Sequence, residues 1–294
     1  MLDRRGIGRR EIKNMIIDGK HISSIILVSL KAEIQDLKEK EIVPTLAVIL
    51  IGDEKSSIAY VKQKERKAEE IGAQIEIFRF EESVTNDEIE TLVKKLDSDA
   101  KIHGIILQRP APKHIEIDRL EDFISSEKEV DGFGNHPIYP VPVAEAVLLM
   151  LEDVYIKQKA KNLFSDWLKS KKIVVLGKGE TAGQPIINYF REYGIEPVVI
   201  DSKTKSKDSL MKAADIIISA VGKTIINPSN IKKGVILVGV GMHTQDGKLC
   251  GDYNEEEIKN TASFYTPTPG GVGPVNVAML LKNLVESAED NLPT

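Results

Sequence analysis

The sequence is poor in the features that mark several broad classes of protein. Its single cysteine, Cys250, excludes an internal disulfide framework and a multi-cysteine zinc site, and no metal site is predicted. No apolar run reaches the roughly 18 residues that a membrane span needs. The N-terminus is basic, but it lacks the apolar stretch and the cleavage site of a secretory signal. We therefore expect a cytoplasmic protein without a membrane partner.

Basic residues are not in excess either. The net charge of -5 argues against a general nucleic-acid binder, because phosphate contacts need a basic face. With 41% hydrophobic and 29% charged residues, the composition is typical of a soluble globular protein. A length of 294 residues suits two domains, each with its own core.

The first half of the chain alternates apolar runs with helical patterns. A continuous apolar run at 46–51 ends at a glycine, as in a strand buried on both faces. Further strands are predicted near 75–78 and 102–107, and helices over 22–40, 56–71 and 85–96. This β-α-β-α-β order predicts a parallel sheet covered by helices on both faces.

The second half contains a strand, a glycine turn and a helix within Lys172–Pro185. The spacing G-x-G-x-x-x-G is one residue longer than the common dinucleotide fingerprint. Glycines allow close approach to a pyrophosphate, and the helix N-terminus offers free N–H groups. Asp201 stands 24 residues after Gly177, at the end of the next strand, where a ribose hydroxyl is held in such folds. The pattern predicts a nucleotide-binding half.

The remaining segments are less regular. Residues 1–13 are charged and are expected to lie outside the fold. Residues 143–151 are predicted to be a helix, and 152–170, which include Trp167, a partly solvated helical connection. Residues 265–274 hold three prolines and three glycines and are predicted to be an irregular loop before a helix over 275–289.

Candidate catalytic groups follow from the rule that parallel sheets bind ligands beyond the carboxyl ends of their strands. Gln108 comes directly after a buried strand, so its amide is expected at the rim of a cleft. Tyr60 and Lys64 share a face of the charged helix, but the pattern alone favours a solvated face, and Lys62 and Lys67 are equally good candidates. Asp131 reads as a turn carboxylate. The residues alone predict two α/β halves, one of which holds a dinucleotide.

Several stretches together resemble one family, the bifunctional methylenetetrahydrofolate dehydrogenase / methenyltetrahydrofolate cyclohydrolases. S-I-A-Y-V-K-Q-K is similar to the tyrosine–lysine helix of that family, and G-I-I-L-Q-R-P-A-P to its strand-end motif. K-E-V-D-G-F resembles its K-D-V-D-G-F, and G-K-G-E-T-A-G-Q-P its cofactor loop. A-A-D-I-I-I-S-A-V-G and T-P-T-P-G-G-V-G-P-V-N are close to the two remaining signatures.

The resemblance implies two parallel-sheet αβα domains flanking a folate cleft. The implied domains are a catalytic domain over 14–142, completed by the helix 275–294, and a Rossmann-type NAD(P)-binding domain over 143–274. The implied activity is oxidation of 5,10-methylenetetrahydrofolate with NADP or NAD, followed by hydrolysis to 10-formyltetrahydrofolate. The implied partners are tetrahydrofolate derivatives and a second copy in a homodimer.

The resemblance also implies roles for individual residues. Lys64 matches the lysine that assists proton transfer, Gln108 the glutamine that assists it, Tyr60 the tyrosine against the folate, and Asp131 the carboxylate that binds the pterin amines. Further substrate-binding residues are implied at Pro269, Gly270 and Gly273. The implied cofactor-binding residues are Gly177, Lys178, Gly179, Asp201, Ser202, Ala220, Gly222 and Met242.

The sequence departs from the family pattern at several places. The segment between Phe133 and Val143 is shorter and lacks the usual P-C-T-P-x-G. Arg109 replaces an apolar residue, Asn276 a threonine, and Gly239 an aspartate. These departures leave two alternatives: a monofunctional NAD-dependent dehydrogenase, and a non-catalytic paralogue that binds folate or nucleotide.

The cofactor loop departs as well, with Lys178-Gly179 in place of arginine and serine. Lys178, Ser202 and Lys203 suit a 2′-phosphate, whereas Asp201 repels a phosphate and suits a free ribose hydroxyl. We predict at least comparable use of NAD.

Overall fold

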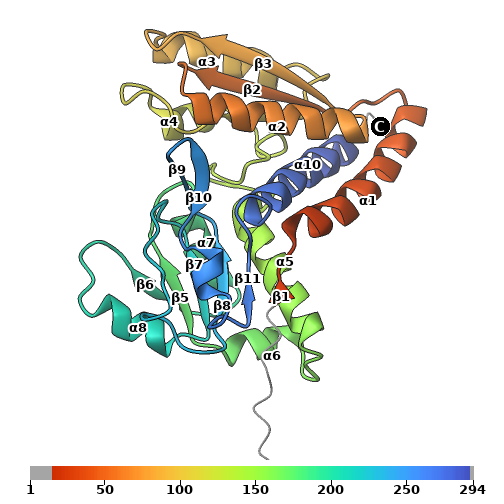
Figure 1. The fold of residues 1–294 in the computed structure, drawn as a ribbon. Helices are drawn as coiled ribbons and strands as arrows, with labels where there is room; N and C mark the ends of the chain where they lie inside the picture. Colours follow the sequence, from red (N-terminus) through yellow and green to blue (C-terminus); the bar gives the residue numbers. More distant parts are fainter. Residues whose placement is uncertain (1–14, 292–294) are drawn as a thin grey trace, which may run out of the picture.

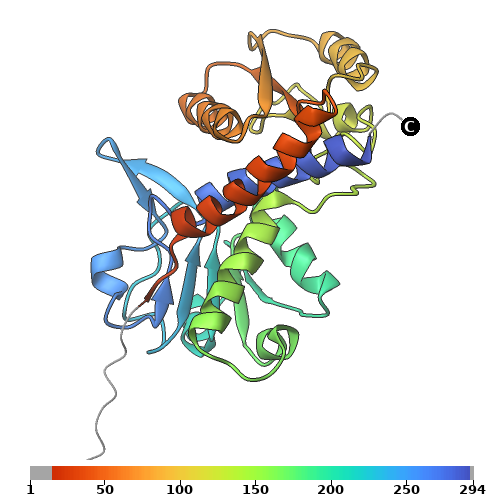
Figure 2. The same cartoon turned by 90° about the vertical axis from the view of Figure 1, so that its right-hand side faces the viewer.

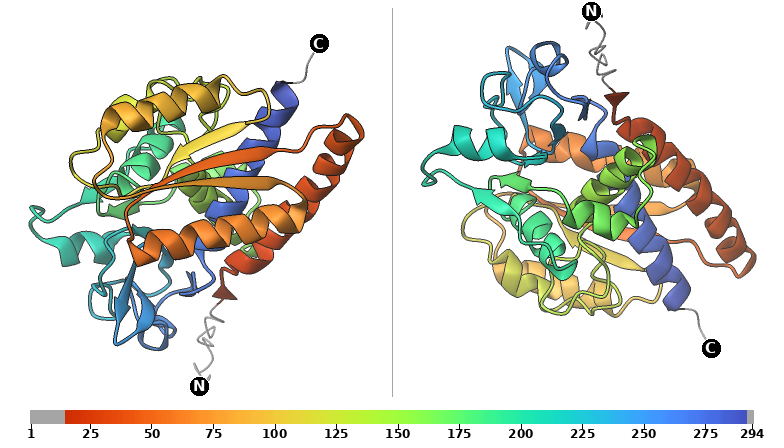
Figure 3. Two further views of the ribbon diagram at one scale, coloured as in Figure 1. Left: turned by 90° about the horizontal axis from the view of Figure 1, so that it is seen from above. Right: turned by 90° about the horizontal axis from the view of Figure 1, so that it is seen from below.

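The structure, a computed structural model, describes residues 15–291 and contains two parallel sheets. The first has the order β3-β2-β4, formed by β2 (Thr45–Ile51), β3 (Gln74–Phe80) and β4 (Gly104–Leu107). All seven residues of β2 are buried, as its apolar run predicts for the central strand. The helices α2 (Lys55–Ile71) and α3 (Asn86–Asp97) lie on opposite sides of this sheet (Figure 3, left). The predicted β-α-β-α-β unit is confirmed.

The second sheet has six strands in the order β1-β11-β8-β7-β5-β6. The strand pairs within it are parallel. Its strands are β1 (Met15–Ile16), β5 (Ile173–Leu176), β6 (Val198–Ile200), β7 (Ile216–Ser219), β8 (Ile236–Gly239) and β11 (Phe264–Tyr265). The helices of this half are α6 (Phe164–Lys169), α7 (Gly183–Glu192), α8 (Lys207–Ala213) and α9 (Glu255–Ile258). The predicted fold class, two parallel-sheet α/β halves with a Rossmann-type second half, is confirmed (Figure 1).

Three long helices join the two halves. They are α1 (Gly19–Glu39), α5 (Pro142–Lys157) and α10 (Val272–Asp290), and α1 and α10 run side by side across both halves (Figure 2). One face of α10 packs Val275 and Met279 into the core of the second half, and another packs Leu281 and Leu284 against the first half. The C-terminal helix therefore belongs to both cores.

The structure corrects several local predictions. The irregular loop is shorter than predicted, because α10 begins at Val272 and accommodates Pro274 in its first turn. Trp167 is buried rather than partly solvated, and it stacks with Phe164 at 5.9 Å between ring centroids. The predicted connection 152–170 is the end of α5 followed by the separate helix α6.

A hairpin was missed entirely. It consists of β9 (Met242–Gln245) and β10 (Lys248–Gly251), which pair antiparallel. The turn between them is Asp246-Gly247, and both residues have positive φ, 51° and 73°. Asp-Gly is a strong signal for such a two-residue turn, so the sequence did contain the information.

The N-terminal strand belongs to the second sheet rather than the first. Strand β1 lies at the edge of the second sheet, although the boundary at residue 14 groups it with the first half. Residues 1–13 lie outside the described residues. Within 15–291, no helix combines the length and the apolar character needed to span a bilayer.

Candidate active site

Helix α2 carries two of the candidate catalytic residues on its inner face. The helix ends at Gly72, whose φ of 92° is the left-handed C-cap that glycine favours. Tyr60 and Lys64, one turn apart, line the same cavity, with the Lys64 amine 5.2 Å from the tyrosine ring centroid. Lys64 is only 4% exposed, whereas Lys62 is exposed. The alternative of a solvated face therefore holds for Lys62 and not for Lys64.

Gln108 meets Lys64 from the end of β4. The side chain is 9% exposed, and its Oε1 accepts a hydrogen bond from Lys64 Nζ at 3.1 Å. Its Nε2 donates to the backbone carbonyl of Arg109 at 2.7 Å. A carbonyl oxygen can only accept, so this contact fixes the amide with its oxygen toward the lysine.

Asp131 reaches the same cavity from a tight turn. The carboxylate of Glu129, three per cent exposed, accepts hydrogen bonds from the backbone N–H groups of Asp131 at 3.2 Å and Phe133 at 3.3 Å. Gly132 takes a positive φ of 75°. Any Cβ there would lie 2.7 Å from the backbone nitrogen of Val141, so the turn requires glycine. Glu129 therefore holds the turn that presents Asp131.

Tyr60 is fixed by a residue from the other end of the chain. Its hydroxyl accepts a hydrogen bond from the Asn276 side chain on α10. Burial raises the pKa of Tyr60, and the charge of Asp131 adds to the effect, so the phenol stays neutral and keeps its proton. Asn276 entered the sequence analysis only as a departure from the family threonine; the structure brings it into the site.

These four candidates, Tyr60, Lys64, Gln108 and Asp131, line one cavity of about 250 Å³. The same cavity is lined by Thr181 and Ala182 from the second half. Burial lowers the pKa of Lys64, while the charge of Asp131 opposes that effect. Burial raises the pKa of Asp131, while Lys64 and Arg109 lower it. A lowered pKa favours the neutral amine, which is the form that can accept a proton.

A second cavity, of about 530 Å³, lies beyond the ends of β5 and β6. Its lining contains five predicted cofactor residues: Gly177, Lys178, Gly179, Asp201 and Ser202. Three more lysines line it, Lys203, Lys207 and Lys223. Of these, only Lys203 was predicted from the sequence to suit a phosphate. Lys178 Nζ lies 2.9 Å from Asp201 Oδ2, and this contact, with hydrogen bonds from Thr204 and Lys203, lowers the pKa of Asp201.

The glycine turn fits a nucleotide for steric reasons. Gly177 has a φ of 86°, and a Cβ there would lie 2.7 Å from the carbonyl oxygen of Ala220. A Cβ on Gly183 would run into the carbonyl of Gly177, so α7 starts as close to β5 as two backbones allow. Gly179 has open space around it. The strand end, turn and helix start thus leave backbone accessible to a pyrophosphate, and the lysines supply positive charge.

The other predicted residues do not line these two cavities. Gly222 has a φ of 62° and lies beside the backbone carbonyl of Met242. Pro269, Gly270 and Gly273 do not line the catalytic cavity described above; Gly270 lies against the side chain of Lys20.

Asp252 is a residue that the sequence analysis missed. It is fully buried and accepts hydrogen bonds from Ser219 Oγ at 2.6 Å and from the backbone N–H groups of Val221 at 3.2 Å and Lys223 at 3.0 Å. Asp252 thereby fixes the loop after β7 that borders the nucleotide cavity.

Comparisons with known proteins agree with this arrangement. The family model for the catalytic domain of tetrahydrofolate dehydrogenase/cyclohydrolase matches residues 17–131, and the model for the NAD(P)-binding domain of the same family matches residues 155–292. The chain belongs to this family. The predicted resemblance is therefore confirmed, and with it the enzyme class and the NAD(P) cofactor class.

Individual relatives cover nearly the whole chain. The Bifunctional protein FolD of an Exiguobacterium species is 36% identical over 275 residues, which are 93% of this chain and 98% of the relative. The crystal structure of the bifunctional FolD methylenetetrahydrofolate dehydrogenase/cyclohydrolase from Campylobacter jejuni has a TM-score of 0.87 at 34% identity, covering 95% of this chain and 99% of that one. The Trypanosoma brucei enzyme, complexed with NADP and an inhibitor, has a TM-score of 0.85 at 27% identity, covering 96% and 99%.

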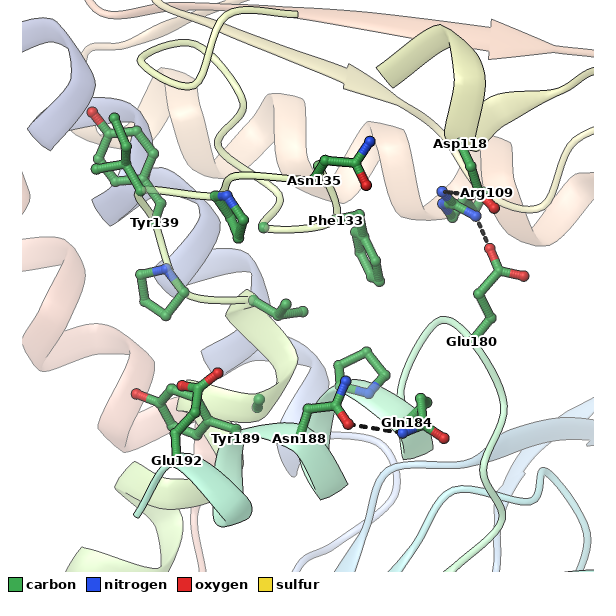
Figure 4. Close-up of a pocket in the computed structure, with 18 of the residues that line it drawn as sticks. Arg109, Asp118, Phe133, Asn135, Tyr139, Glu180, Gln184, Asn188, Tyr189 and Glu192 are labelled. Atoms are coloured by element: carbon green, nitrogen blue, oxygen red, sulfur yellow. Dashed lines mark hydrogen bonds and ion pairs between the residues drawn. The ribbon is translucent and has the colours of Figure 1, made fainter. Parts of the chain in front are cut away.

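This member of the tetrahydrofolate dehydrogenase/cyclohydrolase family has a further cavity beside its short segment 133–143. The cavity measures about 830 Å³ and lies between that segment and α7 (Figure 4). Phe133, Asn135 and Tyr139 face it from one side, and Asn188 and Tyr189 from the other. Arg109 and Phe133 line this cavity and the catalytic cavity alike.

Proposed function

We propose that this family member oxidises 5,10-methylenetetrahydrofolate to the methenyl compound with NAD(P), and hydrolyses that product to 10-formyltetrahydrofolate. The single observation that carries the proposal is the cavity in which Lys64, Gln108, Asp131 and Tyr60 converge, beside the start of α7. The proposed division of labour assigns 14–142 and the C-terminal helix to folate and 143–274 to the nucleotide.

Lys64 is proposed to move the proton in the hydrolytic step. Burial lowers the pKa of Lys64 and so favours the neutral amine, the form that can accept a proton from the water that attacks the methenyl carbon. One N–H of the neutral amine donates to Gln108 Oε1, which leaves its lone pair for that water. Gln108 thus orients the base.

Asp131 and Tyr60 are proposed to hold the pterin. A carboxylate accepts two parallel N–H bonds from an aminopyrimidine edge, which fixes the orientation of the ring. The neutral phenol of Tyr60, held by Asn276, offers a flat surface on which the pterin can stack. Pro269, Gly270 and Gly273 are proposed to shape the approach to this ring.

A bound NAD(P)⁺ supplies the acceptor for the hydride that leaves the methylene bridge. The chain residues proposed to hold it are the glycine turn with Lys178, Asp201 and Ser202, and the borders formed by Ala220, Gly222 and Met242. The open backbone between Gly177 and Gly183 supports a pyrophosphate site.

Comparable use of NAD and NADP is proposed from two opposed charges. The lowered pKa of Asp201 keeps its carboxylate ionised, so it repels a 2′-phosphate, and it also engages Lys178 in an ion pair. Lys203, Lys207 and Lys223 attract a phosphate. The repulsion by Asp201 and the attraction by the lysines oppose each other, so NADP is expected to have little advantage over NAD.

The protein is further proposed to be a cytoplasmic homodimer in one-carbon metabolism, supplying formyl groups of the kind purine biosynthesis uses, without a nucleic-acid or membrane partner. The dimer is supported by β6, an edge strand of the second sheet with partly exposed Val198 and Val199. Size-exclusion chromatography with light scattering tests it: a monomer at micromolar concentration contradicts it.

The test of the function is an absorbance assay that follows methenyltetrahydrofolate and reduced cofactor separately, starting from methylenetetrahydrofolate with NAD or NADP. The proposal predicts that the methenyl compound forms and then decays. If the methenyl compound forms but decays only at the uncatalysed rate, the protein is the monofunctional dehydrogenase. If no reduced cofactor forms at all, it is the non-catalytic paralogue.

A further inference from the structure

Arg109 is fixed by groups of the catalytic half. It follows Gln108 at the end of β4, and its side chain is 10% exposed. Its Nη2 donates to Asp118 at 2.8 Å and to Glu121 at 2.7 Å, both on the short helix α4 (Ile117–Glu121). The guanidinium also lies 5.1 Å from the ring centroid of Phe133. An arginine held in this way presents its remaining donors in a fixed direction.

One of those donors reaches the second half. Arg109 Nη1 forms an ion pair with Glu180, in the loop between β5 and α7 (Figure 4). Glu180 is 65% exposed, and within residues 15–291 its carboxylate has no other ion pair. Its loop neighbours Lys178 and Gly179 line the nucleotide cavity, while Thr181 lines the catalytic cavity. The ion pair therefore links the catalytic half to the loop that serves both cavities.

We propose that Arg109 and Glu180 are a positioning pair, which sets how closely the cofactor loop approaches the folate. The inference rests on the proposed function and adds two residues to it, because both stand where the family resemblance assigns no role. Reacting groups must be held within about 0.5 Å of the productive geometry. A displacement of about 1 Å can slow a reaction about a hundredfold. A fixed arginine on one half and a tethered loop on the other supply such a constraint.

The two proposed reactions separate this role from a merely structural one. Oxidation needs folate and nucleotide in register, and so depends on both halves. Hydrolysis depends on Lys64, Gln108 and Asp131, all of which belong to the catalytic half. Loss of the pair should therefore slow oxidation and spare hydrolysis. A variant with general damage to the fold would lose both.

The test compares Glu180→Ala with Glu192→Ala. Glu192 is an exposed acid at the far end of α7 that makes no ion pair with Arg109, so its removal changes charge equally and leaves the pair intact. We expect Glu180→Ala to lower single-turnover oxidation about tenfold. The deuterium isotope effect on kcat should rise because transfer becomes rate-limiting, and methenyl hydrolysis without cofactor should stay within twofold. Glu192→Ala should match the wild type in all three.

A second readout needs no activity. Spin labels at Lys95→Cys on α3 and Lys212→Cys on α8, in a Cys250→Ser background, report the distance between the halves; both lysines are exposed. Glu180→Ala should broaden that distance distribution relative to the wild type and Glu192→Ala. An unchanged distribution with unchanged oxidation overturns the positioning role. Equal loss of both reactions also overturns it. A wild type that oxidises no methylenetetrahydrofolate defeats the proposed function instead.

Discussion

Lys64 and Gln108 face each other at 3.1 Å in a buried cavity, and the carbonyl of Arg109 holds the glutamine amide in the one orientation that offers the lysine an acceptor. The base and the group that orients it thus come from different elements, α2 and β4. Both side chains are largely buried, which strengthens the hydrogen bond between them relative to one exposed to bulk water.

Replacement of the glutamine tests this arrangement. Gln108→Ala should lower cyclohydrolase kcat by about 10- to 100-fold, because the lysine loses the acceptor that aims it. The control is Gln63→Ala, which removes an amide from the same helix as Lys64. A stopped-flow assay of methenyltetrahydrofolate decay measures both, and equal rates for the two variants contradict the role of Gln108.

The pH profile tests the coupling between Asp131 and Lys64. The carboxylate raises the pKa of the amine against the opposing effect of burial, so Asp131→Asn should lower that pKa further. Neutral lysine is the active form, so the acid limb of the cyclohydrolase profile should move to lower pH, while KM for folate rises. An acid limb at the wild-type position shows that Lys64 is not the group that titrates.

Glu121 makes the stability depend on pH. Burial raises its pKa to about 7, with Arg109 acting in the opposite direction. This folded value lies above the ordinary 4.5, so the stability that Glu121 contributes is complete below pH 4.5 and is lost as the pH rises through 7. Compared with Glu121→Gln, the wild type should lose up to about 3 kcal/mol of unfolding free energy across that window.

Urea unfolding at pH 4.5 and pH 8 measures this difference. Asp118→Asn is the matched control, because it removes an exposed partner of Arg109. If the wild type and Glu121→Gln respond to pH in parallel, Glu121 is already ionised in the folded protein at pH 4.5.

Cofactor choice should respond to Asp201. Asp201→Ser removes the charge that repels a 2′-phosphate and releases Lys178, so the kcat/KM ratio of NADP to NAD should rise about tenfold. Asp208→Ser, an exposed acid on α8, should leave the ratio unchanged. In the wild type, a hundredfold preference for NADP contradicts the proposed comparable use of NAD.

The sequence predicted what depends on local pattern. The apolar run of β2 predicted a central parallel strand, and the position of Gln108 after β4 predicted a strand-end amide at a cleft. The glycine turn predicted the nucleotide cavity. Gly177 and Gly183 are required because a Cβ at either position would meet nearby backbone, and the sequence motif records that local requirement.

Contacts between distant segments could not be predicted in this way. Helical periodicity does not distinguish Lys64 from Lys62; the difference is that β4 and the turn at Asp131 close over Lys64. The Asn276 contact with Tyr60 spans most of the chain, and α10 must pack against α2 before it exists.

Hydrolysis of methenyltetrahydrofolate by Lys64→Ala, with exposed Lys62→Ala as control, tests the central claim most directly. The wild type and Lys62→Ala should hydrolyse it at similar rates. Lys64→Ala should be at least about a hundredfold slower, because no other amine lines the catalytic cavity within residues 15–291. Hydrolysis at the wild-type rate by a folded Lys64→Ala variant would show that Lys64 is not the base.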